Sequence, residues 1–116
     1  MNRFLFVLVS LAMAAIPTAV SADSVQDRLN RLPANMFTSE KSIDALELCI
    51  GIGMSEHLMP TVLRGEKRRL IYGSLIGTAA IGYLVAIEDT DIQRMIAFNA
   101  GKGYDGRTDR AIRACL

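Results

Sequence analysis

His57 is the only histidine in this 116-residue chain, so any general acid–base mechanism that depends on an imidazole must use it. The residue comes shortly before Pro60, where a helix is expected to end. A protonated histidine is favoured electrostatically at a helix C-terminus. No hydroxyl and carboxylate stand at a spacing that suggests a nucleophilic triad. We therefore predict a capping role for His57 and no enzymatic activity.

The only two cysteines, Cys49 and Cys115, are predicted to form a disulfide. Together with one histidine they cannot complete an ordinary tetrahedral zinc site. An exported chain enters an oxidising compartment, where a lone pair of cysteines is expected to be joined. The bond would close a loop of about 67 residues, worth about 4 kcal/mol on the chain-entropy model. No metal or cofactor is predicted.

Residues 101–106, GKGYDG, match the G-x-G-x-x-G pattern of phosphate-binding loops. Such a loop must open the crossover helix of a βαβ unit, with an acidic ribose ligand about twenty residues further on. The sequence ends at Leu116, too early for that arrangement. Asp89 and Asp91 likewise offer fewer oxygens than calcium takes. Both segments are predicted to be turns.

The most distinctive charged segment is basic and contains Arg64, Lys67, Arg68 and Arg69. Such a run is commonly a solvated loop. Its functional interpretation is contact with an acidic partner or with anionic headgroups, to which each basic side chain near the surface contributes about 1 kcal/mol. We predict that these four residues bind a protein partner.

Residues 1–22 have the features of a signal peptide. Arg3 provides the positive n-region, residues 4–16 form an apolar stretch, and Val20-Ser21-Ala22 is a small-residue cleavage site. An uncleaved anchor is the alternative. Cleavage near Ala22 predicts a periplasmic or secreted protein.

Loss of Arg3 with the leader leaves twelve basic against twelve acidic residues. This balance provides no general field for nucleic acid, so nucleic-acid binding is not expected. The remaining length suits one domain. We assign residues 23–38 to a polar lead-in and residues 39–116 to a single disulfide-stapled domain.

The fold depends on residues 70–87, LIYGSLIGTAAIGYLVAI, which carry no charge. Strands are favoured because each of the three glycines costs a helix about 1 kcal/mol. In the second half of the run, Ile81, Tyr83, Val85 and Ile87 would fall on one face of a strand. Gly82, Leu84, Ala86 and Glu88 would fall on the other. A buried helix and a membrane span are the alternatives, and the Gly73–Gly77 spacing is typical of helices that pack closely in membranes. A span would place the two cysteines on opposite sides of the bilayer, which argues against it.

Spacing and turn residues predict the remaining elements. A helix capped by Thr38 or Ser39 is expected to carry Cys49, and a last helix over 108–115 is expected to be capped by Thr108 or Asp109. A hairpin is predicted around the basic run, with strands at 61–63 and 69–72. Residues 92–98 fit either a returning strand or a short helix after a Thr90–Gln93 capping box.

We therefore predict an α+β domain with an early helix, a small antiparallel sheet of three or four strands, and a C-terminal helix pinned by Cys115. The alternative is an all-α chain with a buried or membrane-spanning helix at 70–87. We expect a small exported, non-enzymatic binding or accessory protein that acts on an unknown protein partner, for example as an inhibitor. A small membrane-associated protein that uses residues 70–87 is the alternative, and membrane contact is not favoured.

Overall fold

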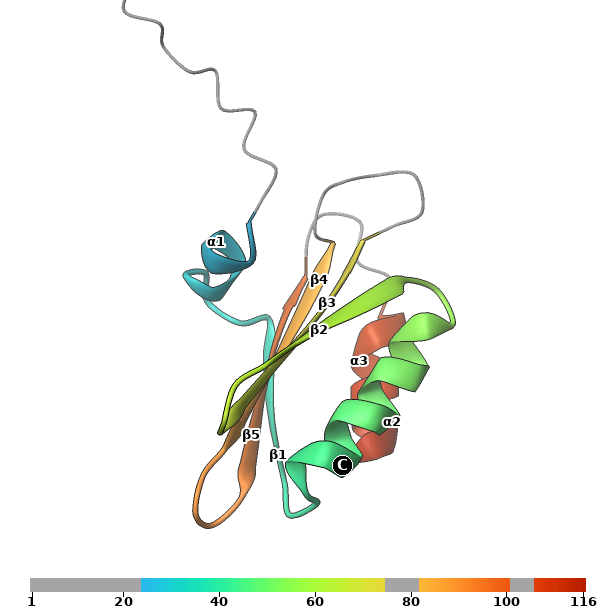
Figure 1. Cartoon of the computed structure of the whole chain (residues 1–116). Coiled ribbons are helices and arrows are strands. Elements are labelled where there is room, and N and C mark those ends of the chain that lie inside the picture. The colour runs from blue at the N-terminus through green and yellow to red at the C-terminus, as the bar shows by residue number, and fades with distance from the viewer. Residues whose placement is uncertain (1–23, 75–81, 101–105) are drawn as a thin grey trace, which may run out of the picture.

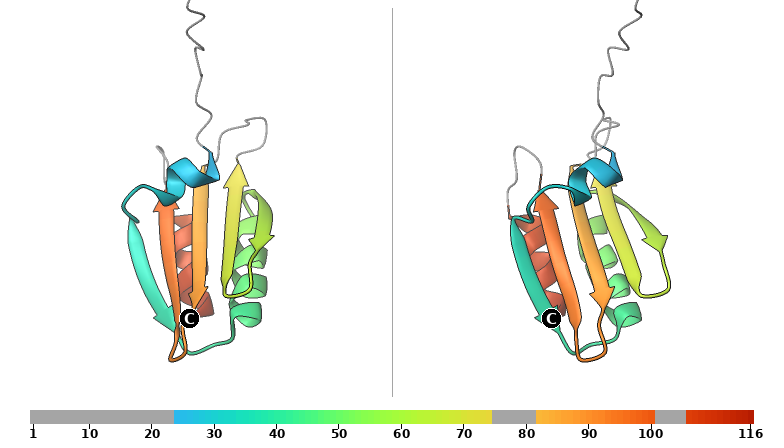
Figure 2. Two further views of the ribbon diagram at one scale, coloured as in Figure 1. Left: turned by 60° about the vertical axis from the view of Figure 1, so that its left-hand side comes forward. Right: turned by 90° about the vertical axis from the view of Figure 1, so that its left-hand side faces the viewer.

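A five-stranded antiparallel sheet forms the centre of the protein, in the order β1-β5-β4-β3-β2. The computed structural model describes residues 24–74, 82–100 and 106–116. Figures 1 and 2 show α2 and α3 on one face of the sheet and the short α1 against the other face. The elements are α1 Val25–Leu29, β1 Asn35–Ser39, α2 Ile43–Ser55, β2 Met59–Arg64, β3 Arg68–Ser74, β4 Tyr83–Asp89, β5 Arg94–Ala100 and α3 Arg107–Cys115.

The apolar run at 70–87 contributes two strands. Its ends lie in β3 and β4, which pair antiparallel with Ile71 opposite Val85. The α+β prediction is confirmed, and the all-α alternative is wrong. Within the described ranges, no helix is long and apolar enough to cross a membrane. The middle of the run, with Gly77, lies outside the described residues, as do the predicted signal peptide and most of the GKGYDG loop.

The sheet has five strands, so the prediction of three or four is wrong. The additional strand is β1, which lies mostly in the segment assigned to a polar lead-in and pairs with β5 through Phe37 opposite Ile96. Its five residues alternate, with Phe37 and Ser39 buried and Met36 and Thr38 exposed. The folded unit therefore begins before residue 39.

Residues 92–98 fitted either a strand or a short helix in the sequence. The structure shows a strand, because β5 spans Arg94–Ala100. One bond of the predicted capping box is present between Thr90 and Gln93, but it closes the turn between β4 and β5. The Gln93 amide donates to the Thr90 hydroxyl at 3.1 Å, and the Thr90 hydroxyl donates to the Gln93 carbonyl. The bond from the Gln93 amide is common to a capping box and a turn, whereas the second bond ends on the Gln93 backbone carbonyl and belongs to the turn alone.

The helix caps differ from the predicted ones. α2 is capped by Ser42, whose hydroxyl accepts from the Ala45 amide at 3.2 Å, because Ser39 belongs to β1. The N-cap of α3 is Gly106, whose φ of 83° favours glycine and which provides no side-chain hydrogen bond to the helix. Thr108 lies inside this helix and is fully buried.

The main core lies between the sheet and the α2–α3 layer. Strand residues that point to the helices alternate with residues that point away, as the period of a strand requires. The fully buried side chains of this core are Leu46, Ile50, Met54, Ile71, Val85, Ile87, Ile96, Phe98 and Ile112.

A disulfide joins the two core helices. Cys49 in α2 and Cys115 in α3 are bonded with an S–S distance of 2.06 Å, which confirms the predicted pair. The helices also approach closely near Gly53, where an added Cβ atom would lie 2.8 Å from the Ala111 Cβ. The helix layer is therefore fixed both covalently and by close packing.

Candidate functional site

Arg64 and Arg69, two of the four predicted partner-binding residues, are directed to the helix side of the sheet. Arg64 donates from Nε and Nη2 to the two carboxylate oxygens of Glu47 in α2, at 2.7 and 2.8 Å. Arg69 lies 3.4 Å from the same carboxylate and 3.3 Å from Asp44. The Glu47 carboxylate raises the pKa of Arg64 through these hydrogen bonds and its charge. These two arginines therefore tie the β2–β3 hairpin to α2.

Arg68 points to the opposite, outer face of the sheet. It follows from strand alternation that Arg68 and Arg69 face opposite ways. The Arg68 Nε atom lies 3.4 Å from the carboxylate of Glu88 in β4. Lys67 is exposed in the hairpin loop, where its carbonyl accepts from the Asp89 amide. The structure thus divides the predicted basic run between two faces and places counter-charges beside its arginines.

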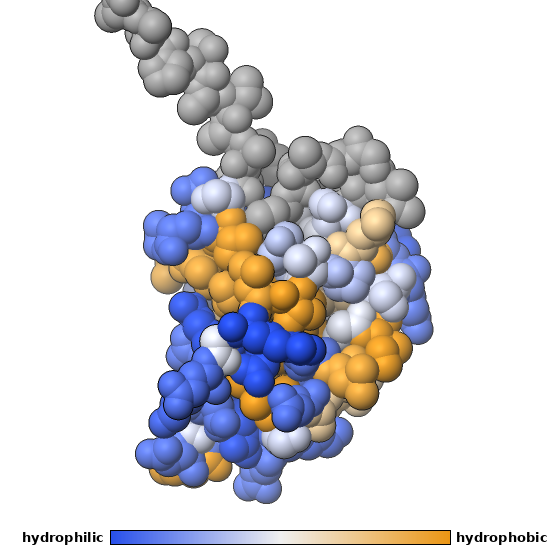
Figure 3. Space-filling model, viewed as in Figure 1, coloured by the Kyte–Doolittle hydropathy of each residue, from blue (hydrophilic) through white to orange (hydrophobic). Residues whose placement is uncertain are grey.

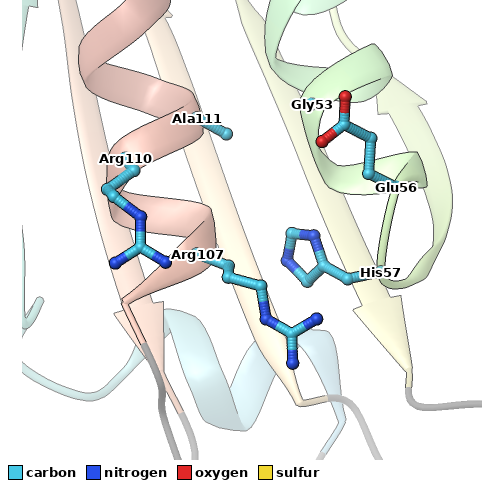
Figure 4. Close-up of a pocket in the computed structure, with 6 residues that line it drawn as sticks. All are labelled: Gly53, Glu56, His57, Arg107, Arg110 and Ala111. Carbon is cyan, nitrogen blue, oxygen red and sulfur yellow. The ribbon is translucent and has the colours of Figure 1, made fainter.

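His57 lies just beyond the end of α2, as the sequence predicts, and lines a cleft of about 330 Å³ between α2 and α3. Figure 4 shows the imidazole between the two helices, with the Arg107 side chain extending beneath it. The Nε2 atom lies 2.9 Å from the Thr108 hydroxyl, and the ring meets Tyr83 edge-on at 6.4 Å between centroids. Glu56 and Arg110 complete the charged lining of the cleft.

Among the described residues that line the cleft, none is a serine, threonine or cysteine that could act as a nucleophile. Thr108, the hydroxyl that contacts His57, is fully buried, so a substrate in the cleft cannot reach its oxygen. In the part of the chain that the structure describes, no group of three His, Cys, Asp or Glu residues could hold a metal ion. The contact of His57 with Thr108 instead links the end of α2 to the first turn of α3.

A second depression lies on the outer face of the sheet, under α1. It has a volume of about 160 Å³ and is lined by Leu29 of α1, by Met36 of the edge strand β1, and by Met95 and Ala97 of β5. Arg68 and Glu88 provide charged groups beside it. Figure 3 shows hydrophobic surface below α1, next to strongly hydrophilic side chains.

The outer face of the sheet was not predicted as a functional surface, although the sequence contained a signal for it. Residues 83–87 of β4 are all buried, including Leu84 and Ala86, which point away from the core helices. An antiparallel strand with one solvated face normally alternates apolar and polar residues. The continuous apolar run YLVAI therefore indicates a strand that is covered on both sides.

No protein-family model matches the chain, and searches of curated proteins and of solved structures find no match. Its function must therefore be argued from the chemistry of its own surfaces.

Proposed function

We propose that this chain is a small exported binding protein without enzymatic activity, and that it contacts a protein partner through the outer face of its sheet. The observation that carries the proposal is the exposure of Met36 and Met95, which line the same depression as the buried Ala86. Met36 is 57% exposed and Met95 is 36% exposed. Clustered apolar surface of this kind, with charged residues at its margin, is typical of interaction sites.

The geometry of the sheet supports this surface. Met36 lies opposite Ala97, and Met95 lies opposite Thr38, so the two methionines are diagonal neighbours on β1 and β5. Flexible, polarizable methionine side chains adapt well to the shape of a partner. α1 is five residues long and covers one end of this face, which leaves both methionines accessible.

Charged residues at the margin give the surface a polar rim. Arg68 and Glu88 have side-chain exposures of 46% and 54%, and both lie beside the depression under α1. Of the four basic residues predicted from the sequence, Arg68 is thus the one that borders this surface. Charges at a rim mainly affect the rate of association and its salt dependence. The Cys49–Cys115 disulfide is compatible with export to an oxidising compartment.

The proposal is tested by capture of partners from a periplasmic or culture-medium extract of the source organism, followed by mass spectrometry. The double variant Met36→Glu/Met95→Glu should lose a partner that the unchanged protein captures, because carboxylates in the contact would have to be desolvated. Ile92→Glu is the matched control, because Ile92 is 87% exposed and lies in the β4–β5 turn outside the depression. Equal capture by the unchanged protein and the double variant would contradict the proposal.

Single charge reversals separate the two faces. Arg68→Glu should weaken capture while the protein stays folded, because Arg68 is a half-exposed rim residue. Arg69→Glu should lower stability, because its side chain is only 13% exposed and lies beside the Glu47 carboxylate. Circular dichroism distinguishes loss of folding from loss of binding.

A further inference from the structure

β2 is one of the two edge strands of the described sheet, and it pairs with β3 alone. The Gly65 amide donates to the Arg68 carbonyl at 2.7 Å, and the Gly73 carbonyl accepts from Gly82, on the β4 side, at 2.9 Å. Because hydrogen-bonded and non-hydrogen-bonded pairs alternate in an antiparallel ladder, these two bonds fix the pattern of β2. The backbone groups of Pro60, Val62 and Arg64 therefore point away from β3.

The outward edge of β2 consequently offers few donors. Proline has no amide hydrogen, so Pro60 contributes a carbonyl alone. Val62 and Arg64 each contribute an amide and a carbonyl. An added strand can therefore satisfy two donors and three acceptors at this edge.

An apolar stripe on α2 lies beside this edge. Leu48 and Ile52, about one helical turn apart, are 65% and 58% exposed. They line a groove of about 260 Å³ together with Val62 and Arg64. The opposite side of α2 is also apolar, with Ile50 and Met54 fully buried in the core. A helix that is apolar on both sides is normally covered on both.

The charges on this surface compensate one another within one chain. The side chain of Arg64 is 67% exposed, yet its Nε and Nη2 atoms both donate to the Glu47 carboxylate. A strongly acidic or basic partner therefore meets no unbalanced charge here. This surface combines a strand edge that no other described strand pairs with, a short apolar stripe and an internally neutralised ion pair. Such a surface is complementary to a copy of itself.

We infer that β2 and the Leu48–Ile52 stripe form a two-fold symmetric interface with a second copy of the chain. The two β2 strands pair antiparallel, with Val62 opposite Val62 of the second copy and Arg64 opposite Pro60. In this register the Val62 amides bond to each other's carbonyls, and each Arg64 amide bonds to a Pro60 carbonyl. Every outward donor of both strands finds an acceptor, and the two sheets become continuous.

Charge selects this register over its nearest competitor. A pairing centred on Leu63 would also use all the outward donors. It would, however, place the two Arg64 residues diagonally across the strands, where like charges repel. The pairing centred on Val62 keeps these arginines at opposite ends of the interface, each beside its own Glu47.

The inference is tested by measuring the mass of the purified, disulfide-bonded protein by sedimentation or light scattering at about 100 μM, well above a low-micromolar Kd. We expect twice the chain mass for the unchanged protein. Leu48→Asp/Ile52→Asp should give the single chain mass, because it removes the apolar contact. Val62→Pro should give the same mass, because it removes the central pair of hydrogen bonds. Val62→Ala keeps the amide and should remain dimeric. A monomeric unchanged protein would overturn the inference.

Cysteine substitution tests the register. Residues in a hydrogen-bonded antiparallel pair have Cα atoms about 5.5 Å apart, within the range of a disulfide. Val62→Cys should therefore crosslink two chains on mild oxidation, and Leu63→Cys should not. The reverse result would overturn the register, and peptide mass mapping would show that Cys49 stays joined to Cys115.

This interface is separate from the surface around Met36 and Met95 on the outer face of the sheet. Met36→Glu/Met95→Glu should remain dimeric, whereas Val62→Pro should still capture the partner. Each proposal can thus fail without the other.

Discussion

The two faces of the sheet differ in how completely they are covered. On the inner face, Ile87 and Phe98 are fully buried beneath two helices that are joined by a disulfide. On the outer face, the described covering element is α1, and Met36 and Met95 remain exposed. The contrast indicates that the inner face provides most of the stability, while the outer face leaves apolar side chains exposed.

The largest expected effect comes from the covalent link in the inner layer. Replacement of both Cys49 and Cys115 by Ala should lower the free energy of unfolding by about 4 kcal/mol, because the unfolded chain gains the entropy of a long loop. Urea denaturation followed by circular dichroism measures the change. A loss below about 1 kcal/mol would show that packing alone fixes the helix layer.

A matched pair of truncations compares the two faces directly. Ile87→Ala should cost about 3 kcal/mol, because it leaves a cavity in a fully buried site. Met95→Ala should cost less than about 1 kcal/mol, because that side chain is already 36% exposed. Equal losses in urea denaturation would mean that the outer face is as important for stability as the inner one.

Two glycines extend the comparison to α2. Gly53→Ala should destabilise by about 1–2 kcal/mol, because the new methyl group would lie 2.8 Å from the Ala111 Cβ. Gly51→Ala should stabilise by up to about 1 kcal/mol, because nothing lies within 4 Å of the added atom and alanine favours the helix.

Ala111→Gly provides the control for the clash. It should recover part of the stability lost in Gly53→Ala, since it removes the atom that the methyl group meets. Both changes are read from thermal midpoints. A destabilising Gly51→Ala would show that the outward side of α2 is more constrained than its exposure indicates.

The sequence predicted the parts of the fold that depend on local patterns. Glycines and alternation in residues 70–87 indicated paired strands, and the lone cysteines indicated the disulfide. β1 was missed because it has five residues and its pairing with β5 is far apart in the sequence. Residues 90–93 were ambiguous because the bond from the Gln93 amide to the Thr90 hydroxyl occurs both at a helix start and in a turn.

The site could be predicted only in part. Alternation in the expected strand could have shown that Arg68 and Arg69 face opposite sides. The neutralising role of Glu47 could not be predicted, because it depends on how α2 packs over β2 and β3. The outer face was detectable only from the uninterrupted apolar sequence of β4. That sequence indicates a strand and, in addition, contacts on both of its faces.

The smallest expected effect concerns α1, the cover of the outer face. The Ser24 amide donates to the Asp27 carboxylate at 3.1 Å, and the Asp27 amide donates to the Ser24 hydroxyl at 3.1 Å. These contacts lower the pKa of Asp27 below its ordinary value of 3.8. The hydrogen bond from the Ser24 amide has the largest effect, and the one with the Ser24 hydroxyl is second. The folded state therefore favours the charged form of Asp27. The stability that this charge gives to α1 is present above the ordinary pKa and is lost as the pH falls through the lowered pKa of the folded state.

Acidification should therefore loosen α1 before it affects the inner core. Hydrogen exchange at the amides of α1 should accelerate as the pH falls below 3.8, relative to the intrinsic rates, while β4 stays protected. Asp27→Asn should remove this difference in pH response, because its amide side chain does not titrate. If α1 and β4 lost protection together at the same pH, the cover of the outer face would be part of the same cooperative unit as the core, and the contrast between the two faces would be one of exposure alone.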